Sequence, residues 1–426
     1  MMALLFIVVL FILFLIGMPV AFSMAFASVI LMYINFGEIR AATMSQTMIT
    51  GVNGFTILAV PLFILAAKLM NTSGITDRIF KFCTVLVGYL PGGLGHVNIA
   101  SSIVFSGMSG AAVSDAAGLG QIEIKAMRKA GYDKGFSAAV TSASSTVGPI
   151  IPPSLPLVIY GVTASASVGA LFLAGIVPGL IMGVLMMCLV AFLAFKRGYP
   201  RENIPTVKEF WTSFKKAILP LFTPIIIIGG IFSGYFTATE AAAVAVLYAY
   251  ILGSFVYKEL SIKNIINIVY ESALEAAVLG LIVSAATIYG KVLIQAKIPQ
   301  ELLTTFTSLA KSPTMLLFII IIFLLIIGCF LETVSAITIL MPLLLPLLMQ
   351  FEIDLIHFGI IMVMTLMIGV LTPPFGIVLF TISKIGNISI GKLVKELFPF
   401  YIILLIALLI ITLFPETTLF LPEFLD

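Results

Sequence analysis

The stretch Thr141–Gly161, TSASSTVGPIIPPSLPLVIYG, is apolar enough to lie in a lipid bilayer, yet four prolines and a glycine interrupt it. Proline lacks an N–H, so it leaves the carbonyl four residues earlier without its helical partner. Pro149 therefore releases the carbonyl of Ser145, and Pro152 releases that of Gly148. Unpaired carbonyls cost too much to face lipid, so the helix is expected to break where it lines a cavity or meets an ion.

The composition is typical of a helical membrane protein. Of the 426 residues, 61% are hydrophobic and 10% are charged, and the mean hydropathy is +1.23. Apolar runs of about 20 residues, the length of a membrane-spanning helix, recur from end to end. The net charge of +3 gives no argument for a nucleic-acid partner. No catalytic or metal-binding motif accompanies the spans, so we do not expect an enzyme.

The unusual residues of this stretch recur 221 positions later in the chain. The coinciding positions are Gly148 with Gly369, Pro152-Pro153 with Pro373-Pro374, and Val113-Ser114 with Val334-Ser335. Internal repeats are a common plan of secondary transporters. The sequence therefore predicts two halves that list the same parts in the same order.

Polar, glycine and proline residues divide each half into those parts. The first repeat is expected at 1–195, with scaffold spans at 1–71, a re-entrant hairpin at 95–130 and a broken helix at 135–165. A basic amphipathic connector follows at 196–216. The second repeat, at 217–426, has scaffold spans at 218–292, a hairpin at 313–350 and a broken helix at 356–386. The predicted fold is an all-α polytopic membrane protein of two inverted repeats, each with about five spanning helices plus a hairpin.

The charge distribution supports the inversion. If each hairpin returns to the side from which it enters, each half crosses an odd number of times, and the second half is inverted. With the connector in the cytoplasm, most of the 22 Lys and Arg fall on the cytoplasmic side, as the positive-inside rule favours. Those that fall outside are Arg40, Lys291, Lys297 and Lys311. Both termini are then expected on the outer side.

The broken helices predict ion sites. Freed carbonyls beside hydroxyl groups form a neutral set of oxygen ligands, which suits Na⁺ better than a divalent ion. The hydroxyl residues before the first break are Thr141, Ser142, Ser144, Ser145 and Thr146. The small residues of two hairpin tips, SGMSGAAVSD at 106–115 and GCFLETVSAIT at 328–338, permit close approach to a neighbouring backbone. We therefore expect one ion site in each half, with an anion held between the halves.

Structural roles compete with these functional ones. A proline can simply kink a membrane helix, and a serine can bond back to its own helix. Asp115 and Glu332 are acids inside the membrane, which makes them functional candidates or caps at the hairpin tips. For Glu240, which follows Thr237 and Thr239, we favour a structural role in the first turn of a helix.

Five segments together resemble one known family. They are GMPVAFSMAFASV (17–29), FSGMSGAAVSDAAGLGQIEIKAMRKAGY (105–132), VGPIIPPSLPLVIYG (147–161), FTATEAAAVAVLYA (236–249) and VLTPPFGIVLF (370–380). In order and spacing they resemble the large membrane subunit of tripartite ATP-independent periplasmic (TRAP) transporters. FTATEAAA departs from the many members that have a proline before the Thr-Glu, which leaves only the local start of that helix in doubt.

The resemblance implies a bacterial inner-membrane transporter of the elevator type. Such subunits use a Na⁺ gradient to import carboxylates of the C4-dicarboxylate or sialic acid class. They work with a small four-helix membrane subunit and a periplasmic substrate-binding protein, which we expect to be separate chains here. Na⁺ is the expected coupling ion, and no organic cofactor is expected.

Carried over residue by residue, the resemblance places the sites as follows. The first Na⁺ site would involve Ser106, Ser109, Ser145, Gly148 and Pro149. The second would involve Gly328, Thr333, Met367, Gly369 and Thr372. The substrate would lie near Ser106, Ser109, Asp115, Pro152, Pro153 and Ser154.

Three other functions stay open at this level. A stand-alone Na⁺/divalent-anion symporter would use the same inverted architecture without a binding protein. A membrane enzyme would need Asp115 and Glu332 to converge on one cavity, although the repeat places them on separate hairpins. A channel would show neither Na⁺ dependence nor saturation.

Overall fold

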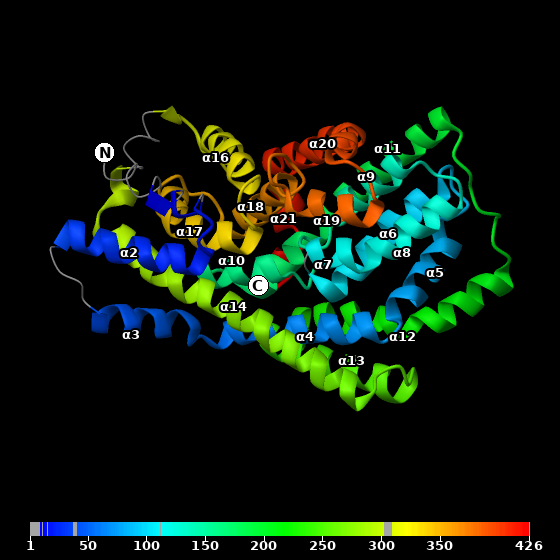
Figure 1. Cartoon of the computed structure of the whole chain (residues 1–426), viewed down its shortest axis with the longest axis horizontal. Helices are drawn as coiled ribbons and strands as arrows, with labels where there is room; N and C mark the ends of the chain where they lie inside the picture. The colour runs from blue at the N-terminus through cyan, green and yellow to red at the C-terminus, as the bar shows by residue number, and fades with distance from the viewer. Residues whose placement is uncertain are drawn as a thin grey trace.

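The computed structural model describes residues 9–10, 12–14, 16–36, 41–110, 112–301 and 309–425. Across these residues the chain is helical and forms no strand, which confirms the all-α prediction (Figure 1). Seven of the described helices are long and apolar enough to cross a membrane by length and composition. The first 16 residues of the scaffold spans predicted at 1–71 lie largely outside the described residues.

Six helices form what we call the scaffold group. They are α2 (Val20–Phe36), α3 (Ala41–Val52), α4 (Ala59–Thr72), α12 (Val207–Phe232), α13 (Ala238–Ile251) and α14 (Ile262–Gln295), with a 3-10 turn at Phe55–Leu58 and a π turn at Leu252–Val256. The long α14 packs on α2, α3 and α4, while α13 packs on both α4 and α12. Figure 1 shows α3, α4, α12 and α13 along the lower side of the molecule, with α14 crossing them.

The remaining helices, apart from α5, form what we call the hairpin group. They are α6 (Gly93–Ser109), α7 (Ala112–Ala117), α8 (Leu119–Lys129), α9 (Lys134–Ser144), α10 (Leu155–Ala164), α11 (Val168–Arg197), α16 (Pro313–Gly328), α17 (Thr333–Gln350), α18 (Leu355–Gly369), α19 (Ile377–Gly386), α20 (Ile390–Leu413) and α21 (Glu416–Leu419), followed by a 3-10 turn at Pro422–Leu425. Helix α5 (Ile75–Val87) lies between the groups, because it contacts both α6 and α12.

The helix bounds of the two halves keep the sequence offset of 221. Moved by that offset, α7 and α8 together cover 333–350, which are the bounds of α17. Moved in the same way, α9 begins at 355, where α18 begins, and α10 covers 376–385, beside α19 at Ile377–Gly386. Breaks between α9 and α10 and between α18 and α19 leave half-helices too short to span alone, because a span needs about 20 residues.

The connector differs from its prediction. Helix α11 ends at Arg197, and α12 begins at Val207 and continues without interruption to Phe232. A capping box starts α12, since the side chains of Thr206 and Glu209 each accept from the other's backbone N–H. Pro220 lies inside the helix without ending it, which membrane helices tolerate. Residues 207–216 are thus the first turns of the helix that continues to Phe232, and the non-helical connector is 198–206.

This short connector is bound to the base of the hairpin group. Tyr199 donates from its hydroxyl to Asp133 Oδ2 (2.7 Å), and Tyr132 donates to the Pro200 carbonyl (2.7 Å). Burial at this contact raises the pKa of Tyr199 to about 12, so its hydroxyl stays protonated at physiological pH. The Arg197 guanidinium pairs with Glu396 of α20 at 2.8 Å.

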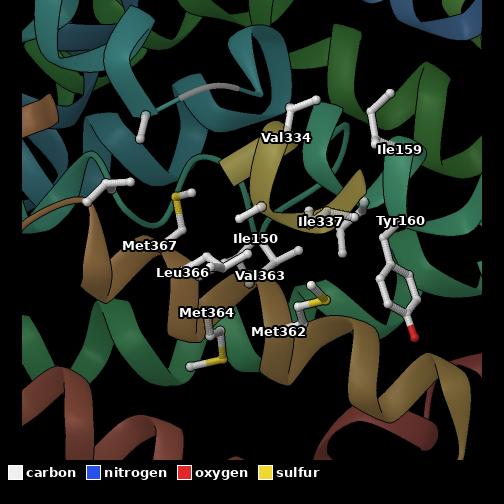
Figure 2. Packing of buried hydrophobic residues seen from close by; sticks show 14 of the residues in the cluster. Ile150, Ile159, Tyr160, Val334, Ile337, Met362, Val363, Met364, Leu366 and Met367 are labelled. Carbon is white, nitrogen blue, oxygen red and sulfur yellow. The ribbon is translucent and has the colours of Figure 1, made fainter. Parts of the chain in front are cut away.

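The broken helices of the two halves share one apolar core. Figure 2 shows Ile159 and Tyr160 of α10 among residues of α17 and α18, including Val334 and Met362. The Tyr160 hydroxyl donates to the Leu355 carbonyl at the start of α18 (2.6 Å). The repeats are therefore interlocked in packing although they are separate in sequence.

Candidate functional site

The first break is a run of turns between α9 and α10. Helix α9 ends at Ser144, and α10 begins after Ser154, whose Oγ accepts from the Leu157 N–H at 3.2 Å. Ser154 Oγ also donates to the Pro149 carbonyl. Among the described residues, the carbonyls of Ser145 and Gly148 accept no hydrogen bond, as the prolines predict.

The tip of the first hairpin rests on this break. Helix α6 is followed by Gly110 in the left-handed conformation (φ 60°), and its carbonyl accepts from the Leu155 N–H at 3.4 Å. A Cβ built on Gly110 would lie 2.6 Å from the Pro153 carbonyl oxygen. Only glycine combines this φ with so close an approach, so the small residues of the tip serve the contact with the broken helix.

Asp115 of α7 brings a carboxyl group to the same break. Its side chain is 2% exposed, and a Cβ built on Gly148 would overlap its Oδ2 atom. The carboxyl group thus touches the backbone of the residue whose carbonyl Pro152 releases. Released carbonyls beside an acid make an oxygen-rich environment that fits a monovalent cation.

The second hairpin meets the second break in the same manner. The Cys329 carbonyl, at the end of α16, accepts from the Gly376 N–H at 3.4 Å. Gly376 lies 221 residues after Leu155, the donor in the first half. A Cβ built on Gly328 would lie 3.1 Å from the Gly369 Cα, so the two backbones are in contact.

The freed carbonyls of the second break find backbone partners. The Gly369 carbonyl accepts from the Thr372 N–H at 2.8 Å, and the Val370 carbonyl accepts from the Val378 N–H at 3.3 Å. The two breaks therefore share their position and their contact with a hairpin tip. They differ in how their carbonyl groups are satisfied.

The hydroxyl groups before the first break divide into two sets. Thr141 Oγ1 accepts from the side-chain amide Nδ2 of Asn98 at 2.6 Å, and Ser144 Oγ donates to the side-chain oxygen Oδ1 of Asn98 at 2.6 Å. The others donate back to their own helix: Ser142 to Ala138, Ser145 to Ser142 and Thr146 to Ala143. Ser106 of α6 does the same, donating to Ile103 at 2.5 Å.

The structure brings some of the predicted site residues together. Those buried at the first hairpin and break are Ser106, Asp115, Ser145, Gly148, Pro149, Pro152, Pro153 and Ser154. Gly328, Thr333, Met367 and Gly369 are buried at the second, and Thr372 there is partly exposed, its Oγ1 donating to the Ile368 carbonyl at 2.8 Å. Ser109 ends α6, and its side chain lies outside the described part of the chain.

The acids outside the first break have structural contacts. Glu240 accepts from the Thr237 N–H at 2.8 Å in a capping box, which confirms its structural role. Glu332 caps α17, where its carboxylate accepts from the Ser335 N–H at 3.2 Å.

Asn98 and Glu123 are two polar residues that the sequence reasoning passed over. Asn98 is fully buried and bridges α6 to α9 through Thr141 and Ser144. Glu123 of α8 is 1% exposed and accepts from Ser101 of α6 at 2.9 Å. For Asn98 the signal was present in the sequence, because an amide inside an apolar run needs a partner on another helix. Glu123 lies in a polar helix, whose composition gives no such signal.

A cavity of about 560 Å³ separates the first hairpin tip from the scaffold group. Its volume lies within the ordinary range of small-molecule sites. The cavity is lined by Phe63, Ile64, Ala67 and Lys68 of α4, by Gly110, Val113, Ala117, Pro153 and Leu155 of the tip and break, and by Leu274, Glu275, Val278 and Leu279 of α14. Of the residues predicted to bind substrate, Pro153 lines it.

Comparisons with known proteins agree with these features. A family model described as "Tripartite ATP-independent periplasmic transporter, DctM component" matches residues 7–417. The sialic acid TRAP transporter large permease protein SiaM of Vibrio cholerae is 45% identical over 96% of this chain and 95% of its own length. The sialic acid TRAP transporter permease protein SiaT of Haemophilus influenzae is 41% identical over 96% of this chain and 66% of its own.

A solved structure shares the fold. The YdaH transporter of Alcanivorax borkumensis, whose crystal structure is described as revealing an unusual topology, superimposes with a TM-score of 0.61 over 88% of each chain at 14% identity. The matched relatives are permeases, which confirms the expectation that the chain is not an enzyme. The chain belongs to the DctM family, the large membrane permease subunits of tripartite ATP-independent periplasmic transporters.

Proposed function

We propose that this permease couples the inward movement of Na⁺ to the import of an organic acid anion of the sialic acid or C4-dicarboxylate class. A periplasmic binding protein delivers the anion, and a separate small membrane subunit completes the transporter in the bacterial inner membrane. The hairpin group moves against the scaffold group as an elevator. The observation that carries this proposal is the hairpin tip resting on a broken helix, which occurs once in each half.

Na⁺ fits the chemistry of the first break. Carbonyl oxygens released at Ser145 and Gly148 are neutral ligands, and the nearby Asp115 carboxyl group adds negative charge. A divalent ion usually takes several carboxylates, whereas a monovalent hard cation accepts carbonyls. Helix ends at the tip and break add backbone dipoles, which favour a charged ligand.

The arrangement of hydrogen bonds supports an elevator motion. Within the scaffold group, Ser284 donates to the Met48 carbonyl at 2.8 Å and Lys291 to Thr47 at 3.0 Å. Within the hairpin group, Asn98 joins α6 to α9 and Tyr160 joins α10 to α18. Two of the cavities where the groups face each other are lined mainly by apolar side chains. Apolar surfaces can shift past each other without breaking directional bonds.

The names of the relatives suggest the first substrate to test. The relative from Vibrio cholerae is named as a sialic acid permease, and it covers nearly the whole chain. N-acetylneuraminate is therefore the first probe, and succinate represents the C4-dicarboxylates. Both are carboxylates, so the proposed coupling applies to either.

The proposal is tested by reconstitution in proteoliposomes. The purified permease is combined with the small subunit and binding protein of the same bacterium, and radiolabelled uptake is measured with an inward Na⁺ gradient or with choline in its place. We expect uptake only with Na⁺ and only with binding protein. Uptake that ignores Na⁺ would refute the coupling, and uptake without binding protein would favour a stand-alone symporter.

The membrane orientation needs a separate test. We propose that residues 198–206 lie in the cytoplasm and that both termini lie in the periplasm. Single cysteines are introduced in the connector and near the C-terminus of a chain without native cysteines. A membrane-impermeant thiol reagent added to intact spheroplasts should label the C-terminal position only, and labelling of the connector would contradict the orientation.

A further inference from the structure

Lys68 lies at the boundary between the two groups, in the cavity under the first hairpin tip. Among the described residues that line this cavity, Lys68 is the cation and Glu275 is the anion, and most others are apolar. Gly110 and Pro153, which form the contact between tip and break, line the opposite wall. Any small molecule in the cavity therefore has the proposed ion site on one side and Lys68 on the other.

The Lys68 ammonium is held by two carboxylates of α14. Its Nζ lies 2.8 Å from Glu275 and 3.3 Å from Glu271, so the group carries a net negative charge. The Lys68 side chain is 22% exposed, whereas those of Glu275 and Glu271 are 57% and 63% exposed. The lysine is thus the sheltered member, and the glutamates reach it from the open side.

This asymmetry decides which partner can be replaced. An ion pair whose glutamate is more than half exposed contributes little net free energy, so exchanging that partner costs little. Lys68 is the less exposed ion of the pair, so an anion beside it is worth more to the lysine than the lysine is to the glutamate. An incoming carboxylate can therefore take the place of Glu275 on the ammonium, which keeps an anion beside it.

A second cavity lies beside the first. It has a volume of about 410 Å³ and is lined by Ala117, which also lines the first cavity, together with Asn71, Gly74 and Asp77 beside the end of α4. Lys68 lies one turn before that end. Neighbouring turns of α4, at Lys68 and Asn71, thus line the two cavities.

We propose that Lys68 binds the carboxylate of the transported anion on the scaffold side of the cavity, and that Glu275 is the exchangeable counter-ion that holds Lys68 when no substrate is present. This rests on the proposed function insofar as the cargo is an organic anion. It assigns the recognition of the carboxylate to a scaffold residue outside the two repeated breaks.

The test is equilibrium binding of N-acetylneuraminate and of succinate to the purified permease in NaCl, without binding protein. Lys68→Met should weaken the affinity about tenfold or more, as expected for a lost hydrogen bond to a charged group. Lys68→Arg keeps the charge and should stay within about threefold of the wild type. Glu275→Gln removes the competitor and should tighten binding about twofold to fivefold.

A matched ion pair elsewhere provides the control. Arg78 pairs with Glu259 at 3.0 Å, with side chains 26% and 41% exposed, and neither residue lines the cavity. Arg78→Met should leave the affinity unchanged. If Lys68→Met also leaves it unchanged, or if Glu275→Gln weakens binding, the ion pair merely ties α4 to α14 and the proposal is overturned.

The two proposals fail in different ways. If uptake depends on Na⁺ but Lys68→Met leaves the affinity for the anion unchanged, this inference alone is contradicted. A Lys68-dependent affinity that is equal in NaCl and choline chloride contradicts Na⁺ coupling alone. If neither anion binds to the wild-type permease, Lys68 does not bind a substrate carboxylate and this inference is overturned.

Discussion

Gly328 at the end of α16 and Gly369 at the end of α18 touch through their backbones, so that a Cβ built on Gly369 would lie 2.6 Å from the Gly328 Cα. Backbone atoms cannot move aside as a flexible side chain can. Gly369→Ala should therefore separate the second hairpin from its broken helix and destabilise the protein by about 1–3 kcal/mol, the usual cost of overpacking. Thermal unfolding in detergent measures this loss.

The control is Gly229→Ala in α12. No atom lies within 4 Å of a Cβ built there, so the added methyl group meets open space. Replacing a helical glycine with alanine then changes stability by about 1 kcal/mol or less, in the favourable direction. Equal melting temperatures for the two variants would contradict the close contact.

Asp115→Asn should weaken Na⁺ activation. The change keeps the shape of the side chain but removes its negative charge beside Gly148. Two unit charges a few Å apart near a protein surface interact by about 4 kcal/mol, so losing even part of this should raise the half-saturating Na⁺ concentration about tenfold or more. Glu240→Gln, which alters only a helix cap, should leave that concentration as it is. A wild-type Na⁺ response in Asp115→Asn would remove the carboxylate from the ion site.

Ser145→Ala should change the Na⁺ response little. Its Oγ donates to the Ser142 carbonyl at 2.9 Å, and the proposed ligand at this residue is the carbonyl freed by Pro149. We expect a half-saturating Na⁺ concentration within about twofold of the wild type, since the hydroxyl is bonded within its own helix and is not a proposed ligand. A tenfold rise would show that the hydroxyl itself is a ligand.

Asn98→Ala should destabilise the hairpin group. It removes hydrogen bonds to Thr141 and Ser144 and leaves two buried hydroxyl groups without that partner. The expected loss in the free energy of unfolding is about 2–4 kcal/mol. Each of the two lost hydrogen bonds contributes about 1 kcal/mol, and the unsatisfied polar groups and the missing side-chain volume add to this. Thr84→Ala, where the hydroxyl donates only to its own helix, is the control, with an expected loss of about 1 kcal/mol or less.

The positions of the breaks could be predicted because they depend on covalent chemistry. Proline acts on the carbonyl four residues earlier whatever surrounds it, so the prolines at 149 and 152 placed the freed carbonyls at Ser145 and Gly148. The offset of 221 likewise placed α18 from α9, since an ungapped repeat carries helix bounds with it.

The directions of the hydroxyl groups could not be predicted. Whether Ser144 faces Asn98 or its own helix depends on how α9 is rotated against α6, which no local pattern records. The pairing of Lys68 with Glu275 joins helices from different halves, so it too needed the packed structure. That residues 207–216 continue into the next helix could not be predicted, because the first turns of that helix have the same basic, amphipathic composition as an interfacial segment.

The Asn98 bridge has a mechanical consequence. It ties the first hairpin to the broken helix through hydrogen bonds that are fully enclosed in protein, so in the proposed elevator motion these two parts would move as one rigid body. The surface on which that body would glide is mostly hydrocarbon, with Ile64 and Phe63 on one side and Val113 and Leu155 on the other. The hydrogen bonds would thus stay within the moving group, while its boundary with the scaffold group is mostly apolar. The permease could then open its site to either side of the membrane without partial unfolding.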